Sequence, residues 1–303
     1  MFTRILVPTD FSKPSDVALA YARQLADSTG ATLHVIHVVD NMFLRVVLAD
    51  PHDYETAALR QLQDRVPVED GGPTAILVVE RSDEPADEIT SYARTHDIDL
   101  IVMGTHGRGR VAHLLLGSVA EKVARTASCP VLTMRETPRT GEAEALRILV
   151  PTDFSAYADA ALGCAKRLAA SLGGSIRLLH VMEHSASGAS FRPELFVPEP
   201  PEIEAEMVTD ARIQLSSRIL GDSRSRVTMT SDVIAGPVNA MITAYAGDAG
   251  FDLIVMGTRG RNGFARLLMG SIAESVIRTA RCPVLTVRSR ATGCARATDA
   301  HAA

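Results

Sequence analysis

The residues best suited to binding chemistry are glycines followed by a serine, and they recur at one spacing in both halves of the chain. Glycine lets φ be positive and lets a negatively charged group approach the backbone closely. The successive amides of such a turn can form an anion nest, and a helix that starts at the second glycine-serine step adds free N–H groups. The pattern therefore indicates a phosphate site in each half. It is formed by Gly104, Gly107, Gly117 and Ser118, and again by Gly257, Gly260, Gly270 and Ser271.

The serines of this pattern also permit an interpretation without a ligand. Ser118 with Glu121, and Ser271 with Glu274, have the spacing of a capping box, in which the serine side chain caps the start of a helix. Duplication copies structural glycines as well as functional ones. The sequence therefore leaves both interpretations open.

Charged side chains lie close to these loops. Arg108 and Arg261 each follow the second glycine and would add positive charge beside a phosphate. Asp10 and Asp153 come directly after the first strand of each half. In an open α/β sheet the ligand lies at the carboxyl ends of the strands, where a carboxylate can accept a hydrogen bond from a ribose hydroxyl. The alternative for both aspartates is an N-cap of the following helix.

Histidines inside the second strand of each half are expected to be structural. We expect His37 and His180 to be buried, hydrogen-bonded core residues. His34 lies three positions before His37, so the two side chains point to opposite faces of a strand and form a poor metal pair. No metal site is predicted.

Several common motifs are absent from the sequence. There is no GxxxxGK[ST], which argues against a P-loop NTPase. No GxGxxG follows the first strand with an acidic residue about 20 positions on, which argues against a dinucleotide site. A G-x-S-x-G nucleophile elbow is also missing. We therefore assign no catalytic residue.

The chain is an internal duplication. RILVPTDFS occurs at 4–12 and at 147–155, an offset of 143, whereas DLIVMGT and CPVLT recur at an offset of 153. The second copy is therefore ten residues longer in its middle. We place the extra residues in a long loop around 185–202, which contains four prolines. The predicted domains are 1–136 and 146–289, with a linker at 137–145 and a disordered tail at 290–303.

Short apolar runs alternate with amphipathic segments in each copy. The runs are rich in Val, Ile and Leu, as expected for strands buried on both faces. Their alternation with helices predicts an α/β fold of two tandem doubly wound domains, each a five-stranded parallel sheet flanked by helices. Gly30 and Gly173 follow the first helix, where a left-handed residue is expected. In the first copy the predicted strands are Ile5–Val7, Thr32–Val39, Thr74–Val79, Leu100–Met103 and Val131–Met134, and the predicted helices are Asp16–Ser28, Tyr54–Arg65, Ala86–Thr95 and Val119–Ala127.

The last strand of each copy, Val131–Met134 and Val284–Val287, is apolar and would be a sheet edge if left alone. Edges of this kind invite pairing. We predict that the two copies pair with each other through these strands. The sequence does not decide whether two chains also form a homodimer.

Composition is typical of a globular protein of two domains, with 303 residues, 46% hydrophobic and 22% charged. The net charge of −5 gives no sign of nucleic acid or an anionic membrane as a partner. The apolar runs are too short to span a bilayer, and the N-terminus lacks the apolar region of a signal peptide. Four scattered cysteines fit neither a disulfide framework nor a zinc site. We expect a cytoplasmic protein with reduced thiols.

The combined motifs resemble the universal stress protein family in its tandem two-domain form. They are a first strand followed by PTDFS, HV at the end of the second strand, DLIVMGT, G-x2-G-x9-G-[ST] and CPV. The resemblance covers nearly the whole chain. It implies a five-stranded parallel α/β fold that pairs through its last strand. It also implies ATP as the bound nucleotide, with Mg²⁺ carried by the phosphates as an option.

The resemblance also implies roles for individual residues. Asp10 would contact ribose, Val38 would hold adenine through its backbone, and the glycines with Ser118 would hold the phosphates. In the first copy the implied binding residues are Pro8, Thr9, Asp10, Val38, Met103, Gly104, Thr105, Gly107, Arg108, Gly117, Ser118 and Val119. In the second copy they are Pro151, Thr152, Asp153, Val181, Met256, Gly257, Thr258, Gly260, Arg261, Gly270, Ser271 and Ile272.

One position departs from the family pattern. The family often has a glycine six residues ahead of the first buried isoleucine of the third helix, and the second copy keeps it as Gly236 before Ile242. The first copy has Asp83 before Ile89, next to Glu84. If this loop lies near the nucleotide, crowding or charge repulsion would weaken binding in the first copy.

The leading hypothesis is an ATP-binding regulator with little or no hydrolysis, in which the nucleotide acts as a switch or tether for an unknown protein partner. One alternative is a slow adenine-nucleotide hydrolase or transferase of a related α/β class. Another is a scaffold whose loops are structural remnants. Intact glycine and serine positions in both copies oppose the scaffold, and the lack of an obvious general base opposes the enzyme.

Overall fold

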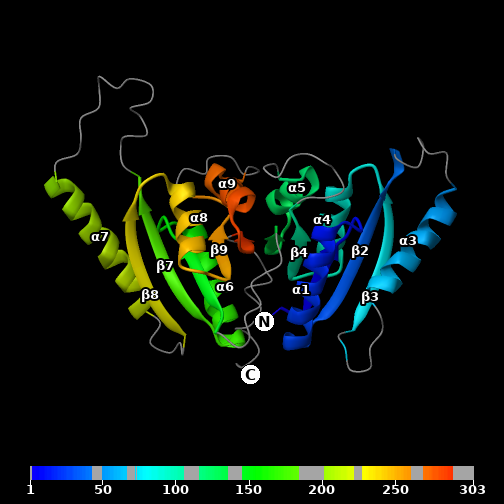
Figure 1. Cartoon of the computed structure of the whole chain (residues 1–303), viewed down its shortest axis with the longest axis horizontal. Helices are drawn as coiled ribbons and strands as arrows, with labels where there is room; N and C mark the ends of the chain where they lie inside the picture. The colour runs from blue at the N-terminus through cyan, green and yellow to red at the C-terminus, as the bar shows by residue number, and fades with distance from the viewer. Residues whose placement is uncertain are drawn as a thin grey trace, which may run out of the picture.

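The computed structural model describes residues 2–42, 50–66, 72, 74–105, 116–135, 145–183, 201–221, 227–260 and 269–288. Within these residues the chain forms one ten-stranded sheet with helices on both faces (Figure 1). The predicted tail and all but the last residue of the predicted linker lie outside the described residues.

Domain 1 is the half of the sheet formed by the first five strands. Its strand order is β3-β2-β1-β4-β5, and all four pairings are parallel. The chain winds outward in one direction from β1 to β3 and in the other through β4 to β5, so the winding reverses between β1 and β4. Its strands are β1 (Arg4–Pro8), β2 (Thr32–Asp40), β3 (Ala75–Ser82), β4 (Leu100–Gly104) and β5 (Val131–Met134), and its helices are α1 (Lys13–Thr29), α3 (Pro51–Arg65), α4 (Pro85–Thr95) and α5 (Ser118–Thr126).

Domain 2 repeats this arrangement in the order β10-β9-β6-β7-β8. The predicted fold class is confirmed, and the elements predicted in the first copy agree with the structure to within three residues at each end. The strands of domain 2 are β6 (Arg147–Pro151), β7 (Ser175–Met182), β8 (Thr228–Ala235), β9 (Leu253–Gly257) and β10 (Val284–Val287), and its helices are α6 (Ala156–Leu172), α7 (Pro201–Leu220), α8 (Val238–Asp248) and α9 (Ser271–Thr279).

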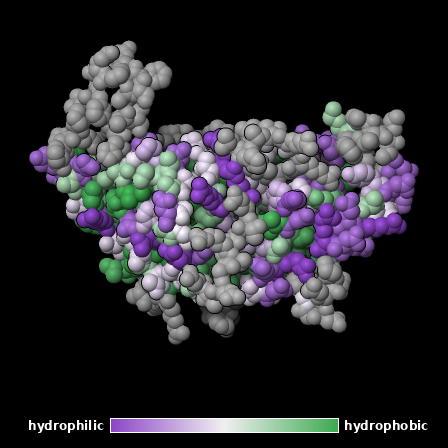
Figure 2. Space-filling model, viewed as in Figure 1, coloured by the Kyte–Doolittle hydropathy of each residue, from purple (hydrophilic) through white to green (hydrophobic). Residues whose placement is uncertain are grey.

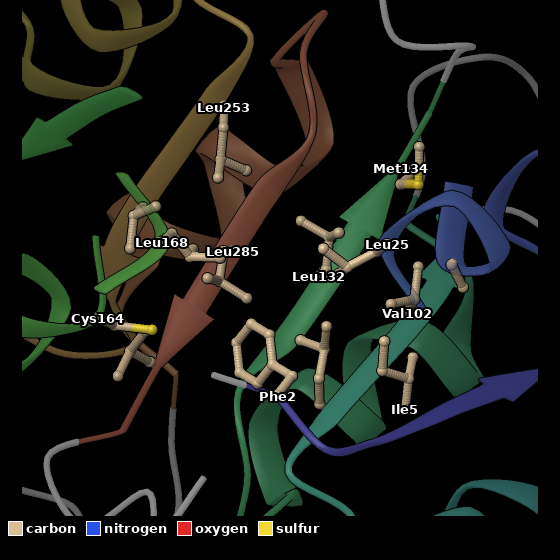
Figure 3. Close-up of a cluster of buried hydrophobic side chains, with 14 of the residues drawn as sticks. Phe2, Ile5, Leu25, Val102, Leu132, Met134, Cys164, Leu168, Leu253 and Leu285 are labelled. Atoms are coloured by element: carbon tan, nitrogen blue, oxygen red, sulfur yellow. The ribbon is translucent and has the colours of Figure 1, made fainter. Parts of the chain in front are cut away.

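The two domains join through their last strands, as the apolar edges predict. β5 and β10 run antiparallel with Leu132 opposite Leu285 (Figure 3). Thr133 and Thr286 each donate a side-chain hydrogen bond of 3.2 Å to a backbone carbonyl of the opposite strand. The pairing covers both edges, and it gives the molecule an approximate twofold symmetry in which α5 and α9 lie on either side of the centre (Figure 1).

The core consists of one apolar layer on each face of the sheet. Ile5 and Val7 face the layer that contains α1, α3, α6 and α7, whereas Leu6 faces the layer of α4, α5, α8 and α9. Side chains alternate along a strand, which is why nearly continuous apolar runs are needed here. Both layers cross the junction between the domains, where Phe2 lies near Leu132 and Leu285 (Figure 3).

The first helix of each domain ends as predicted. Gly30 and Gly173 have φ of 69° and 70°, and each amide bonds back into the last turn of its helix. A residue with a Cβ would be strained at this left-handed position.

The extra length of the second copy lies partly in a helix, which corrects the sequence interpretation. α7 has 20 residues and α3 has 15, and positions 201 and 202 begin α7 rather than ending a loop. Proline is compatible with a first helical position because that amide has no intrahelical partner. Segment 184–200 lies outside the described residues.

The outer helices of the two domains differ in surface chemistry. Four large apolar side chains are exposed on α7, and Figure 2 shows hydrophobic surface on the side of domain 2 but mostly hydrophilic surface around α3. The four are Ile203, Met207, Ile213 and Leu220. In the described part of the chain, no helix is long and apolar enough to cross a membrane.

The cysteines only partly match the expectation of reduced thiols. Cys129 and Cys282 are free, and burial raises the pKa of their thiols to about 12 and about 11, which makes them poor nucleophiles at neutral pH. Cys164, buried in α6, is disulfide-bonded. Sequence spacing carries no information on which thiols reach bonding distance in space.

Candidate functional site

Each domain has a pocket where its two central strands end beside the helix that follows the glycine loop. Site 1 lies at the carboxyl ends of β1 and β4 and has a volume of about 480 Å³. Site 2 lies at the ends of β6 and β9 and has a volume of about 670 Å³. The winding of each domain's half of the sheet reverses between these strands, which is where ligands of open α/β sheets bind. Both volumes are in the range of small-molecule sites.

The structure brings most of the predicted binding residues together in these pockets. Their contacts with a ligand stay a prediction. Gly107, Arg108 and Arg261 lie outside the described residues. The predicted residues that line site 1 are Pro8, Thr9, Asp10, Val38, Met103, Gly104, Thr105, Gly117, Ser118 and Val119. Those that line site 2 are Pro151, Thr152, Asp153, Val181, Met256, Gly257, Thr258, Gly260, Gly270, Ser271 and Ile272.

Sequence reasoning missed a second set of lining residues. They come from helices α1, α4 and α5 of domain 1 and α6, α8 and α9 of domain 2, and from strand and loop positions beside the predicted ones, and no local motif marks them as lining residues. In site 1 they are Ser15, Ile36, Pro85, Ile89, Leu116 and Ala120. In site 2 they are Ala158, Leu179, His180, Glu183, Val238, Ile242, Arg259, Met269 and Ala273.

The start of α5 rules out the capping-box alternative. Gly117 is the N-cap residue, Ser118 is the first helical residue, and no side chain caps the helix. Glu121 N donates to Gly117 O at 2.9 Å, so the amides of Ser118, Val119 and Ala120 are the ones that lack an intrahelical partner. All three residues line site 1.

The start of α9 is built in the same way. Gly270 is the N-cap, no side chain caps the helix, and Glu274 N donates to Gly270 O at 3.1 Å. The amides of Ser271, Ile272 and Ala273 are therefore the ones without an intrahelical partner, and all three residues line site 2. Each site thus combines three helix-start amides with one serine hydroxyl, a combination suited to an anion.

The loop glycines have a different physical reason from the one that the sequence suggested. Within the described residues, none of the five has a positive φ. A Cβ on Gly104 would lie 2.9 Å from the backbone of Pro14, and one on Gly257 would lie 2.9 Å from the backbone of Tyr157. These two glycines are required because β4 and β9 end tightly against the start of α1 and α6.

Gly260 has a reason that concerns the site itself. A Cβ at this position would lie 2.8 Å from Oδ2 of Asp153. The carboxylate of Asp153 therefore lies directly against the glycine loop. It is not a remote group at the far end of the pocket.

Asp10 and Asp153 are not helix N-caps, so that alternative is wrong. The N-caps are Ser12 and Ser155. Oδ1 of Asp10 accepts hydrogen bonds from the amide and the hydroxyl of Ser12, at 3.1 and 2.5 Å, and Oδ1 of Asp153 accepts the same two from Ser155, at 3.1 and 2.6 Å. A tight turn thus fixes each carboxylate at the edge of its pocket.

The residue inside each turn carries backbone strain that sequence reasoning missed. Phe11 has φ of 64° and Phe154 has φ of 65°, a left-handed conformation that bulky residues rarely adopt. The ring of Phe11 packs against His37 with 4.3 Å between centroids, and Arg65 lies over it at 4.9 Å. Strain of this kind persists only where the surroundings enforce it, and it is concentrated at functional sites.

The strand histidines hold the turns in place. Nδ1 of His37 lies 2.7 Å from Thr9 O, and Nδ1 of His180 lies 2.8 Å from Thr152 O, so each imidazole donates to the residue before the aspartate. His37 is buried, as expected. His180 is only partly buried, and it also lines site 2. His34 bonds Tyr92 Oη at 2.9 Å on the other face of the sheet, which agrees with its exclusion as a metal partner of His37.

The rims of the two sites differ in charge. Beside site 1, Lys122 of α5 makes ion pairs of 2.8 Å with Glu84 and 3.0 Å with Asp87, which raise the pKa of the lysine. At the corresponding place beside site 2, Asn239 donates to Ser275 Oγ at 2.8 Å. Ile89 and Ile242 are both buried, and the residues that start α4 and α8 line the pockets, so the loop with Asp83 or Gly236 does lie next to each site.

Comparison with known proteins gives one consistent result. The family model described as the universal stress protein family matches residues 1–135 and 145–288. A universal stress protein of Mycolicibacterium smegmatis is 26% identical over 94% of this chain and 97% of its own length. A universal stress protein of Archaeoglobus fulgidus has the same fold, with a TM-score of 0.67 and 23% identity over 94% of this chain and 96% of that chain. A universal stress protein solved in complex with cAMP is 27% identical over 44% of this chain and 97% of its own, with a TM-score of 0.34.

Proposed function

The chain belongs to the universal stress protein family, and we propose that each of its domains binds one adenine nucleotide, ATP, as a regulatory ligand with little or no hydrolysis. The observation that carries the proposal is the start of α5 and α9. In both domains, three amides without an intrahelical partner and a serine hydroxyl border a largely apolar pocket.

The apolar end of each pocket fits a purine base. In site 1 it is formed by Ile36, Val38, Ile89 and Met103. In site 2 the same positions are Leu179, Val181, Ile242 and Met256. A planar base between such side chains would bury apolar area, and each Å² removed from water contributes about 25 cal/mol of favourable free energy.

The backbone at the end of β2 supplies a donor and an acceptor for the edge of the base. β1 pairs with β2 as far as Pro8 and Ile36, and Thr9 N donates to Ile36 O at 2.9 Å. Backbone groups alternate in direction along a strand, so those of Val38 face the same side as those of Ile36, beyond the end of β1. Val181 has the same place in domain 2, because Thr152 N donates to Leu179 O at 2.9 Å. These groups would hold adenine by its edge.

The opposite end of each pocket suits a triphosphate. The helix-start amides and the serine hydroxyl would bind phosphate oxygens, and Arg259 adds positive charge at the wall of site 2. Asp10 and Asp153 would accept hydrogen bonds from ribose hydroxyls. Mg²⁺ would then be carried by the phosphates and needs no dedicated set of protein ligands.

The residues in the pockets are better suited to holding a nucleotide than to cleaving it. Fast NTPases add a lysine on the phosphates, a carboxylate that holds Mg²⁺ and a residue that orients the attacking water. Among the described lining residues, the carboxylates are Asp10 in site 1 and Asp153 and Glu183 in site 2, and none of the lining residues is a lysine. Charge neutralisation without an aligned nucleophile stabilises the ground state about as well as the transition state, and such uniform binding does not raise kcat.

The regulatory role proposed here is that of a nucleotide-dependent switch or tether for an unidentified protein partner in the cytoplasm during stress. The alternative, a slow adenine-nucleotide hydrolase or transferase, uses the same pockets and differs only in turnover.

Turnover therefore tests the proposal. In a single-turnover assay with labelled ATP, we expect phosphate release far below the roughly 1–10³ s⁻¹ of typical enzymes. The control is the double variant Gly117→Val/Gly270→Val, in which branched side chains stand where the phosphates would bind. Turnover of several per second in the native chain that is lost in the control would favour the ATPase.

A further inference from the structure

The two helices that carry the sites are each held at their far end by an arginine of the other domain. Arg288, which directly follows β10, donates from Nη1 to the carbonyls of Arg125 and Ala127, at 3.1 and 3.2 Å. These carbonyls belong to the C-terminal end of α5 in domain 1. Arg135, which directly follows β5, donates from Nη1 to Arg278 O at 2.8 Å, near the end of α9 in domain 2.

This exchange follows from the antiparallel junction. β5 and β10 pass each other with Leu132 opposite Leu285, so the residue after each strand emerges beside the start of the partner strand. The loop from α9 enters the start of β10, and the loop from α5 enters the start of β5. Each arginine thereby reaches the helix end of the opposite domain.

The contacts are favourable for a physical reason. The last carbonyls of a helix have no intrahelical partner and carry the negative end of the helix dipole, so a guanidinium is a preferred partner. The side chain of Arg288 is partly buried, and this burial, followed by the charge of Arg259, lowers its pKa. A charge-assisted hydrogen bond in such a place is stronger than one at an open surface.

A contact at the end of α5 or α9 also fixes the start of the helix. Each helix has nine residues and is therefore about 13 Å long, too short to absorb a displacement by bending. Its other end presents the three free amides to the pocket. A shift or tilt at the C-terminal end therefore moves the amides that face the phosphates.

We propose that Arg288 is a positioning residue for site 1 and Arg135 for site 2, so that each domain completes the geometry of the other domain's site. The ligand part of this inference rests on the proposed function.

The experiment measures each site alone in the full chain. In a Gly270→Val background only site 1 is open, and in a Gly117→Val background only site 2 is open. We expect Arg288→Ala to weaken ATP binding about tenfold at site 1 and by less than about twofold at site 2, within the usual range of coupling between sites. Arg135→Ala should have the reverse pattern, and Arg288→Lys should recover part of the affinity because it keeps the charge.

Arg212→Ala is the matched control, because Arg212 is exposed on α7 away from both sites and should change neither affinity. Equal losses at both sites, a loss in the same domain as the substituted arginine, or no loss would overturn the proposal. A general fall in stability cannot produce the crossed pattern, since it would weaken both sites together.

A second readout needs no ligand and separates this inference from the proposed function. In the nucleotide-free protein, hydrogen–deuterium exchange should increase in α5 after Arg288→Ala and in α9 after Arg135→Ala. An increase in exchange that is confined to the substituted arginine's own domain, or no increase in either helix, would overturn the positioning role. If the crossed exchange pattern is seen but no ATP binds, the positioning role of the arginines is supported and the proposed binding of ATP is contradicted.

Discussion

Sites 1 and 2 are built on one frame but differ at the rim. In both, a turn after the first strand fixes an aspartate, a histidine of the second strand holds that turn, and a glycine starts the helix beside the pocket. Site 1 has about 480 Å³ and an acidic rim that Lys122 partly neutralises, whereas site 2 has about 670 Å³ and Arg259 in its wall. Duplication preserved what the backbone requires and let the charge around it change.

The shared frame and the differing rims lead to separate expectations for the presence of a site and for its affinity. The helix-start amides are the same in both domains, so we expect either domain to accept an anion. The loop before α4 has Asp83 and Glu84 where the loop before α8 has Gly236 and Pro237. Lys122 forms ion pairs with Glu84 and Asp87. Because these pairs are exposed, solvent screening limits how far the charge of Lys122 offsets the repulsion between the acidic rim and the phosphates. We therefore expect site 2 to bind ATP more tightly than site 1.

The largest expected effect is the loss of one site at a time. Gly270→Val should abolish site 2 and Gly117→Val should abolish site 1, each by more than about a hundredfold in affinity, because a branched side chain would stand where the phosphates approach the free amides. Equilibrium dialysis with labelled ATP should give one nucleotide per chain in each single variant and none in the double variant.

The control is Gly163→Val, at a position in α6 where a Cβ would meet nothing within 4 Å. It should keep both nucleotides. If the double variant bound as much ATP as the native chain, the assignment of the phosphate loops would be wrong.

A smaller effect is expected from exchanging the rims. Asp83→Gly removes a negative charge near site 1 and should tighten ATP there about threefold, a change of less than about 1 kcal/mol. Gly236→Asp should weaken site 2 by a similar factor. Affinities of the single-site backgrounds, measured by calorimetry at low and high salt, check both changes, and salt should reduce them.

Strain must be separated from charge at Gly236. Its φ is 142°, and a Cβ there would lie 2.9 Å from Cγ of Met241, so any side chain is unfavourable. Gly236→Ala carries the strain without the charge and is the matched control. Equal affinities for Gly236→Ala and Gly236→Asp, with no gain for Asp83→Gly, would show that the acidic rim does not set the difference between the sites.

The smallest expected effect concerns acid. Burial, followed by His96 and Arg4, lowers the pKa of His34 in domain 1, whereas domain 2 has Arg177 at the corresponding place, which stays charged. The unfolded chain then binds more protons than the folded chain between the lowered pKa and about 6.5. The contribution of His34 to stability is thus full above pH 6.5 and is lost as pH falls through the folded pKa.

Thermal unfolding from pH 8 to pH 5 checks this sign. The midpoint of the native chain should fall more steeply below pH 6.5 than that of His34→Gln, and the two should run parallel above it. A variant that fell as steeply as the native chain would assign the acid sensitivity to other groups.

Most of the frame was predictable from the sequence because repetition and burial leave strong signals. The duplicated RILVPTDFS located β1 and β6, and the apolar runs located the other predicted strands along the chain. The apolar last strands predicted the pairing of β5 with β10. The start of α7 was missed because prolines suit a loop and a first helical turn equally well. The left-handed Phe11 and Phe154 were missed because no residue type signals them.

The candidate site was predictable as a set of residues but not as an arrangement. The spacing of glycine and serine picked out positions that line the pockets. It also left open a capping role for Ser118, whereas Gly117 is the N-cap, and it suggested a positive φ that none of the described loop glycines has. The contact between Gly260 and Asp153 joins positions 107 residues apart, and the crossed arginines join the two domains. Neither leaves a local pattern in the sequence.

The central claim is that each chain carries two adenine-nucleotide sites of unequal affinity. Calorimetric titration of the native full chain with ATP, with cAMP and GTP titrated in parallel, tests it most directly. We expect saturation at two ATP per chain, with the tighter site removed by Gly270→Val and the weaker one by Gly117→Val. The absence of saturable ATP binding, or a stoichiometry that both substitutions leave unchanged, would contradict it.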